Sequence, residues 1–326
     1  MSAPSRGQIL GAFAAIYLLW GGTFLAIRYA VADVPPLLTI GVRCLCAAAL
    51  LFVWLWSRGQ GSVPTAAEWR TAIVAGALLF LGCHGVLAWA EQRVSSGEAA
   101  LFMTAIPLWL VSLDALRVRR LPSGKVLAGL ALGVVGVGLL TVTGEAWSGS
   151  TADRIWLIVS ALFWAIGSLV ARHGARSASV VESTAMQLAA GGAVVLLASV
   201  GMGELSGWSM TEVTSRAALS LGFLVIGGTV LGFGAYTWLL QVTTPAAVGS
   251  YAFVNPVIAL ALAWLVGDGE LTGPVVLAAA IVVGAVVLTW APGTPHAQAL
   301  SSRAERGIFS AYRRPMPRQD PSLRSG

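Results

Sequence analysis

Long uninterrupted apolar segments are the feature that most constrains the fold of this chain. Ten such stretches, each nearly free of charged side chains, can be marked along the sequence. About 20 apolar residues in a helix cross a hydrocarbon layer of about 30 Å. The sequence therefore predicts an all-α integral membrane protein with ten transmembrane helices, at 9–27, 37–56, 71–90, 98–116, 125–143, 154–171, 181–201, 217–239, 246–266 and 274–291.

The composition excludes the main soluble classes. Hydrophobic residues make up 57% of the 326 residues and charged residues only 10%, whereas soluble domains carry about 25% charged residues. A soluble enzyme, a nucleic-acid-binding module and a disordered chain are all incompatible with this balance. The three cysteines, Cys44, Cys46 and Cys83, lie in apolar segments without metal-type spacing and are expected to be buried hydrophobic side chains.

The net charge of +6 comes mainly from the C-terminal tail. Residues 292–326 hold six arginines and two acids, and they are predicted to form a basic, disordered cytoplasmic tail that rests on an anionic leaflet. The rest of the chain has no basic face that could follow a phosphate backbone, so nucleic acid is not an expected partner.

The positive residues in the loops predict the orientation. With a cytoplasmic N-terminus, fifteen lysines and arginines lie on the cytoplasmic side and four on the other side. Positive residues gather on the cytoplasmic side of membrane proteins. Both termini are therefore predicted to be cytoplasmic.

An internal repeat relates the two halves of the chain. At a constant offset of 149 residues, Gly85, Trp89, Gln92 and Pro107 match Gly234, Trp238, Gln241 and Pro256, and at an offset of 144, Trp20, Arg28 and Arg43 fall on Trp164, Arg172 and Gln187. The sequence predicts two five-helix repeats, 1–147 and 148–291. Because five is odd, the second repeat would enter the membrane from the opposite side, an inverted arrangement typical of secondary transporters.

Five sequence pieces resemble the EamA family of the drug/metabolite transporter superfamily. They are LLWGGTFLAIRYA at 18–30, GVR at 41–43, AEQRVSSGEAALFMTAIPLW at 90–109, SYAFVNPVIALALAW at 250–264 and GDGEL at 267–271. The resemblance covers about residues 8–291 and implies ten helices in two EamA repeats. One departure is Leu121-Pro122 after the fourth predicted span, where the family often has an acid followed by leucine. Only Glu270-Leu271 keeps that pattern.

The resemblance implies a metabolite exporter or carrier of the bacterial inner membrane, a family in which some members are linked to amino-acid efflux. It also implies a substrate cavity between spans 1–4 and 6–9, with spans 5 and 10 outside it. Span 5 fits this expectation because Gly129 and Gly133, four residues apart, indicate a packing helix.

Arg43 is the residue most costly to place in a membrane, by about 2.5–3.5 kcal/mol near its centre. It is expected either to anchor a substrate carboxylate or to serve as a structural partner of an acid or of backbone carbonyls. His84 and Glu91 are seven residues apart and share a helix face. His84 is expected to contact substrate or a proton, and Glu91 to couple proton movement or to sit as a solvated interfacial acid.

Two prolines are predicted to act as gating hinges. Pro107 and Pro256 lie within equivalent apolar segments, where a proline removes a helical N–H and frees a carbonyl. Asn255 adds a donor and an acceptor beside one hinge and is a predicted substrate contact. The alternative is kinked packing without a gating role.

Aromatic side chains complete the predicted site. Trp20 and Trp164 match across the repeat and lie beside small residues, where a large ring can wall a pocket. Tyr251 is a further cavity residue. Ordinary packing is the alternative for all three.

Taken together, these features predict a secondary transporter that exports a small metabolite, an amino acid or related compound, by alternating access. The alternatives are a multidrug or cation exporter, and a non-transporting membrane sensor or assembly protein. Enzyme activity, a metal site and a cofactor are not expected, because no catalytic pair or metal set lies at membrane depth and no phosphate-binding motif is present. The expected partners are the lipid bilayer and a small-molecule substrate, with the chain acting as a monomer or a homodimer.

Overall fold

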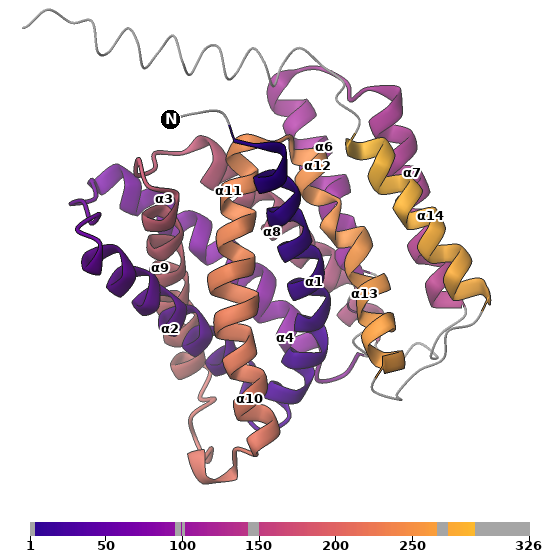
Figure 1. Cartoon of the computed structure of the whole chain (residues 1–326). Helices are drawn as coiled ribbons and strands as arrows, with labels where there is room; N and C mark the ends of the chain where they lie inside the picture. The colour runs from indigo at the N-terminus through magenta and orange to yellow at the C-terminus, as the bar shows by residue number, and fades with distance from the viewer. Residues whose placement is uncertain (1–3, 95–98, 100–101, 143–149, 266–272, 291–326) are drawn as a thin grey trace, which may run out of the picture. The chain divides into compact units, whose positions relative to one another are not determined.

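A computed structural model describes residues 4–94, 99, 102–142, 150–265 and 273–290, and these residues are helical apart from their loops. The predicted tail and the predicted boundary between the repeats lie outside the described residues. The helical elements, shown in Figure 1, are α1 (Arg6–Val31), α2 (Pro36–Ser57), α3 (Ala66–Gly76), η1 (Ala77–Gly85), α4 (Val86–Ala90), α6 (Ala105–Val118), α7 (Gly124–Val142), α8 (Thr151–His173), α9 (Val180–Gly201), η2 (Met210–Glu212), α10 (Ser215–Phe223), η3 (Leu224–Phe233), α11 (Gly234–Val242), α12 (Pro245–Gly249), α13 (Tyr251–Leu265) and α14 (Gly273–Trp290).

Six continuous helices in the described part of the chain are long and apolar enough to cross a membrane: Arg6–Val31, Pro36–Ser57, Ala66–Ala90, Thr151–His173, Val180–Gly201 and Ser215–Val242. Two of them are built of three consecutive elements each, α3–η1–α4 and α10–η3–α11. Shorter apolar helices cover Gly124–Gly136 and Val276–Thr289. The helical class predicted from the sequence is thus confirmed, whereas the full set of ten spans stays a prediction.

Polar side chains at loop ends fix where several helices begin. Ser5, Thr65 and Ser150 each accept from the backbone N–H three residues on, and the side chain at that third position bonds back to complete a capping box. These caps satisfy N–H groups that have no partner within the helix. The caps therefore place the first turns of α1, α3 and α8.

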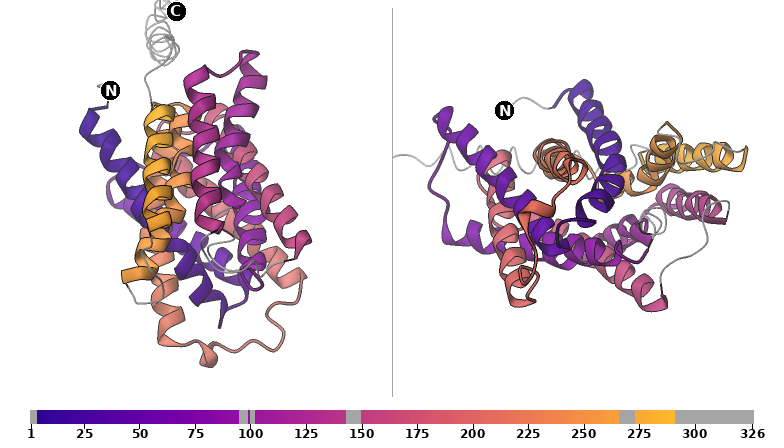
Figure 2. Two further views of the ribbon diagram at one scale, coloured as in Figure 1. Left: turned by 90° about the vertical axis from the view of Figure 1, so that its right-hand side faces the viewer. Right: turned by 90° about the horizontal axis from the view of Figure 1, so that it is seen from below.

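Elements from the two halves of the chain interlock. α1 packs on α13 and η3, and α8 packs in the same way on α6 and η1. α2 packs on α9, which also contacts α3 and η1. α7 and α14 lie side by side, as Figures 1 and 2 show at one edge of the helices. The core therefore forms between the halves rather than within each half.

Glycines permit the closest helix crossings. Gly76 of α3 meets Gly191 of α9, and a Cβ atom on Gly76 would lie 2.6 Å from the carbonyl oxygen of Gln187. On α7, a Cβ atom on Gly129 would lie 2.8 Å from Thr289, and one on Gly133 would lie 2.7 Å from Phe253. Close approach of backbones is the usual role of small residues between membrane helices, so the packing expected for α7 is confirmed.

Two local expectations differ from the structure. Cys44 and Cys83 are buried, but Cys46 is exposed, because a residue two positions along a helix points away from the buried face. The apolar segments around Pro107 and Pro256 are not single helices, since Thr104 interrupts the helix before α6 and Ser250 separates α12 from α13.

The loop after α1 is tied to the start of α10. The backbone N–H and the hydroxyl of Thr214 both donate to the carboxylate of Asp33. These hydrogen bonds favour the charged form and lower the pKa of Asp33 from its ordinary value. The carboxylate of Glu204 accepts from the N–H groups of Leu37 and Leu38 and so caps α2 from another loop.

Candidate functional site

A cavity lies among the helices of both halves. Its walls come from α1, α2, η1, α4, α6, α8, η3 and α13, together with Met103. Its empty volume is about 640 Å³, including the part continuous with solvent. Small-molecule sites commonly occupy such spaces between helices.

All six residues predicted to bind substrate line this one cavity. They are Trp20, Arg43, His84, Trp164, Tyr251 and Asn255, which come from five different elements and are separated by up to 235 positions in the sequence. The structure brings them together, and their role in binding stays a prediction.

Among the described residues that line the cavity, Arg43 is the one cation. Its side chain is 4% exposed, and its Nη2 lies 2.9 Å from Nδ1 of His84. A guanidinium group can only donate, so Nδ1 must accept, and the proton of the neutral imidazole is on Nε2. His84 therefore holds Arg43 in place without neutralising its charge.

Two buried polar atoms of the cavity, one hydrogen-bond donor and one acceptor, have no partner among the described residues. They are Nε of Arg43, a donor, and Oδ1 of Asn255, an acceptor. Both residues are 4% exposed, and both line the cavity. An unpaired buried polar atom costs about 1–3 kcal/mol, so a ligand that carries both an acceptor and a donor would relieve both costs.

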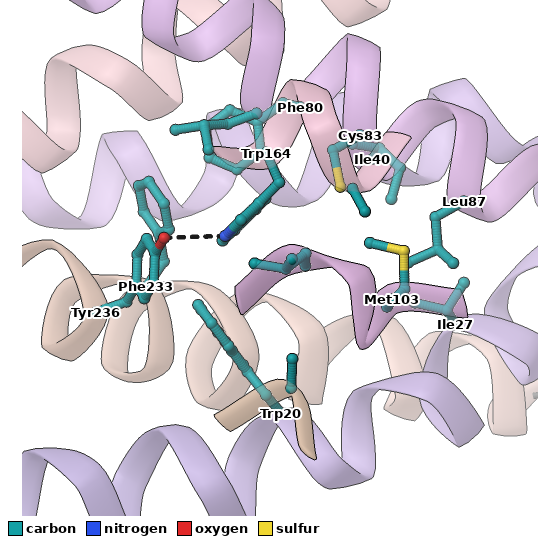
Figure 3. Packing of buried hydrophobic residues seen from close by; sticks show 14 of the residues in the cluster. Trp20, Ile27, Ile40, Phe80, Cys83, Leu87, Met103, Trp164, Phe233 and Tyr236 are labelled. Atoms are coloured by element: carbon teal, nitrogen blue, oxygen red, sulfur yellow. Dashed lines mark hydrogen bonds between the residues drawn. The ribbon is translucent and has the colours of Figure 1, made fainter. Parts of the chain in front are cut away.

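Aromatic rings build one wall of the cavity. Trp20 lies 5.6 Å from Trp164, 5.1 Å from Tyr236 and 4.7 Å from Tyr251, measured between ring centroids. Figure 3 shows Trp20 and Trp164 reaching into the cluster from their separate helices, near Phe233 and Tyr236. Such ring pairs add about 0.5–1.5 kcal/mol each beyond area burial.

A closed ring of hydrogen bonds fixes Trp164. Its Nε1 donates to Tyr236 Oη across 2.9 Å, the dashed line in Figure 3. Ser168 donates to the carbonyl of Trp164 and lies 2.6 Å from Tyr236 Oη. Because a serine hydroxyl has one proton, Tyr236 must donate to Ser168. Every polar atom in this buried ring is therefore paired.

Both three-part helices contain a π-helical section, and both sections face the cavity. η1 contributes Phe80, Cys83 and His84, and η3 contributes Gly228 and other residues to the walls. The indole N–H of Trp20 donates to the Gly228 carbonyl across 2.8 Å. π-helical turns are rare and are frequent at functional sites, which supports a functional reading of the cavity.

Glu91 does not line the cavity but lies just beyond it. It follows α4, is 5% exposed, and neither carboxylate oxygen has a hydrogen-bond partner in the described part of the chain. The expectation of a solvated interfacial acid is therefore wrong, because the side chain is buried. Proton coupling through Glu91 or His84 stays a prediction.

The two predicted hinges lie outside the cavity lining. Pro107 is in the first turn of α6, where its missing N–H removes no helical hydrogen bond, in contrast to the expected mid-helix position. It packs against Gly249, where a Cβ atom would lie 3.0 Å from Pro107 Cβ. Pro256 is inside α13, as expected. The gating role of both prolines stays a prediction.

Contacts between elements flank the cavity at both ends. Tyr17 lies 2.7 Å from Ser250, joining α1 to the start of α13, and Arg172 Nη1 donates to the carbonyls of Leu240 and Thr243 beyond the end of α8. At the opposite end of α8, Asp153 forms an ion pair of 2.8 Å with Arg93, which follows α4. The cavity lies between these two layers of contacts.

Sequence reasoning missed the apolar and small cavity residues. Thr23, Phe24 and Ile27 line the cavity one and two turns beyond Trp20, and Gly228 and Thr229 do so from η3. The residues on α1 follow Trp20 at intervals of three and four, so this helical spacing could have indicated that they share its face. The glycines of η3 gave no such signal, because glycines are also typical of ordinary helix packing. No group of three or more metal-ligating side chains occurs in the described part of the chain.

The family model of the EamA-like transporter family matches the chain twice, over residues 6–142 and 154–291. The chain belongs to the EamA-like transporter family. An Escherichia coli K12 relative named "Uncharacterized inner membrane transporter YedA" is 33% identical over 287 residues, which cover 86% of this chain and 90% of the relative.

Less similar relatives carry other names. "Uncharacterized transporter YoaV" of Bacillus subtilis is 25% identical, with 82% of this chain and 91% of the relative covered. "Probable amino-acid metabolite efflux pump" of Escherichia coli K12 is also 25% identical, with 82% and 90% covered. One solved crystal structure superposes with a TM-score of 0.70 over 88% of this chain and 98% of that chain at 21% identity, which shows a shared fold.

Proposed function

We propose that this EamA-like transporter is a secondary carrier that exports a small zwitterionic metabolite, an amino acid or related compound, across the bacterial inner membrane by alternating access. The observation that carries the proposal is the pair of unpartnered atoms in one cavity, Nε of Arg43 and Oδ1 of Asn255. The guanidinium would bind the substrate carboxylate, and the amide oxygen would accept from its ammonium group.

The distribution of charge favours this substrate class over a cation. Arg43 carries a positive charge that His84 does not neutralise, because the ring nitrogen can only accept from it. A cationic drug would meet repulsion there. The aromatic wall of Trp20, Trp164 and Tyr251 would receive the apolar part of the substrate.

We further propose ten transmembrane helices in two inverted halves, 1–147 and 148–291, with both termini in the cytoplasm. Three observations support this arrangement. The family model matches each half separately. The packing of α1 on α13 and η3 has its counterpart in the packing of α8 on α6 and η1. The π-helical sections η1 and η3 fall at matching places in the two halves.

The names of relatives are consistent with the proposed location and direction. One relative is named as an inner membrane transporter and another as a probable amino-acid metabolite efflux pump. The excess of loop lysines and arginines on one side supports cytoplasmic termini.

Counterflow in proteoliposomes tests the proposal. Vesicles containing purified protein and an unlabelled mixture of the protein amino acids are diluted into the same mixture labelled with ¹⁴C. We expect label to accumulate transiently above the level in protein-free vesicles. Arg43→Ala is expected to abolish this accumulation, and Arg58→Ala, at the exposed end of the same helix, is the matched control. The absence of counterflow by the wild type, or full activity of Arg43→Ala, would overturn the proposal.

A further inference from the structure

Glu91 lies on the cavity-facing stripe of its helix. Phe80, His84 and Leu87 line the cavity at successive turns of η1 and α4, and Glu91 follows four residues after Leu87. Residues four apart lie on one helix face. The carboxylate therefore lies on the same helix face as the cavity-lining residues, one turn past Leu87 and outside the lining itself.

This carboxylate is buried without local compensation. It is 5% exposed, and neither of its oxygens has a hydrogen-bond partner among the described residues. A buried charge without partners is costly, so such a group takes up a proton or depends on a nearby cation.

The charged groups around Glu91 come from each element that packs on α4. α1 contributes Arg28 and α2 contributes Arg43, and both act on Glu91 through their fields without an ion pair of 4 Å or less in the described residues. η1 contributes His84, which is neutral as the acceptor for Arg43. α8 contributes Asp153, whose charge is already paired with Arg93. Arg28 is exposed to solvent, whereas Arg43 is buried, so Arg43 is the buried cation among the groups that act on Glu91.

We propose that Glu91 is a proton-binding site through which the carrier moves one proton in the same direction as the substrate. The reason is that the carboxylates of Glu91 and of the substrate both depend on the charge of Arg43. In the empty carrier the charge of Arg43 stabilises an ionised Glu91. A substrate carboxylate bound to Arg43 takes over that charge and repels Glu91, which then binds a proton. The proposal rests on the proposed function, since it needs a carboxylate substrate at Arg43.

The ammonium group of the substrate does not cancel this effect. Asn255, its proposed acceptor, is on α13, whereas Glu91 packs among α1, α2, η1 and α8. Efflux is then driven by the outward gradient of the substrate itself and carries protons out with it. An inward proton gradient therefore opposes export and does not drive it.

Proteoliposomes with the membrane potential clamped at zero by valinomycin and equal K⁺ test this inference. The ¹⁴C-labelled amino-acid mixture is presented at equal concentrations on both sides, and the outside is acidified by one pH unit. We expect label to accumulate inside, up to about tenfold for one proton per substrate. Accumulation only when the inside is acidified would mean exchange against protons and would overturn the inference.

Variants assign the effect to Glu91. Glu91→Gln is expected to keep counterflow at equal pH but to lose the accumulation driven by acid outside, whereas Glu91→Asp keeps a titratable group and part of the response. Glu68→Gln is the matched control, because glutamine preserves the capping box at Thr65. Gradient-driven accumulation by Glu91→Gln, or loss of its counterflow in a monodisperse preparation, would overturn the role of Glu91.

The outcomes for the two proposals are separable. Wild-type counterflow without any response to pH gradients would remove the proton site and leave the carrier function standing. The absence of wild-type counterflow would remove both.

Discussion

Arg43 Nη2 donates to His84 Nδ1 across 2.9 Å, so the one charged residue of α2 is held by a ring on the π-helical section η1. This contact joins the second and third helical segments of the first half at the cavity wall. It also leaves Nε of Arg43 without a partner among the described residues. The arginine is therefore both fixed in position and available to a ligand.

Removing the acceptor on His84 is expected to loosen Arg43. Hydrogen bonds to charged groups contribute about 1.5–3 kcal/mol, so His84→Leu should lower stability by that order and weaken substrate binding. His84→Gln, which keeps an acceptor, should lose less. Thermal unfolding in detergent and the half-saturation concentration of counterflow measure the two effects. Equal behaviour of both variants would contradict the proposed positioning role.

Tyr236→Phe is expected to destabilise the protein by about 1–3 kcal/mol, because the indole N–H of Trp164 would be buried without a partner. Tyr29→Phe is the matched control, since its ring would still pack under Arg216. Unfolding of both variants in sodium dodecyl sulfate titrations gives the comparison. A loss no larger than that of the control would show that the hydrogen-bonded ring adds little.

Gly76→Ala tests the backbone contact between α3 and α9. The new Cβ atom would lie 2.6–2.9 Å from backbone atoms of Gln187 and Gly191, which cannot move aside as a side chain can. Overpacking of this kind costs about 1–3 kcal/mol. Gly11→Ala on α1 has nothing within 4 Å and should change stability by less than about 1 kcal/mol. A similar free energy of unfolding for the two variants would contradict the packing.

The ion pair between Arg93 and Asp153 is expected to contribute modestly. The Arg93 side chain is 38% exposed, and solvent reduces the coupling energy of such pairs to about 1 kcal/mol or less. A double-mutant cycle of Arg93→Gln and Asp153→Asn measures that coupling, and 1 M salt should shrink it further. A coupling energy well above 1 kcal/mol, unchanged by salt, would indicate a buried pair instead.

The sequence predicted the helical class and the cavity residues for one shared reason. Polar side chains are rare inside apolar segments, and placing Arg43, His84 or Asn255 there costs free energy unless they face one another. These three residues, which stood out as costly in the sequence, all line the cavity.

Other features depend on contacts that no single segment reveals. The burial of Glu91 follows from the packing of α1, α2 and α8 around α4, although its position just past the end of the predicted span 71–90 suggested a solvated acid. The interruption at Thr104 places Pro107 in a first turn, which a continuous apolar stretch cannot indicate. The π-helical sections could not be predicted either, because their glycine-rich composition is also typical of α-helices that pack closely.

The hydrogen-bonded ring of Trp164, Tyr236 and Ser168 has no counterpart at the matching positions of the first half of the chain. The positions that match Tyr236 and Ser168 at the two repeat offsets are Leu87 and Phe24, neither of which can form such bonds. In a carrier whose halves exchange conformations, the two access states would then differ in free energy. The maximal rate of transport at saturating substrate would then differ between efflux and uptake. The final ratio of substrate concentrations across the membrane would be unchanged.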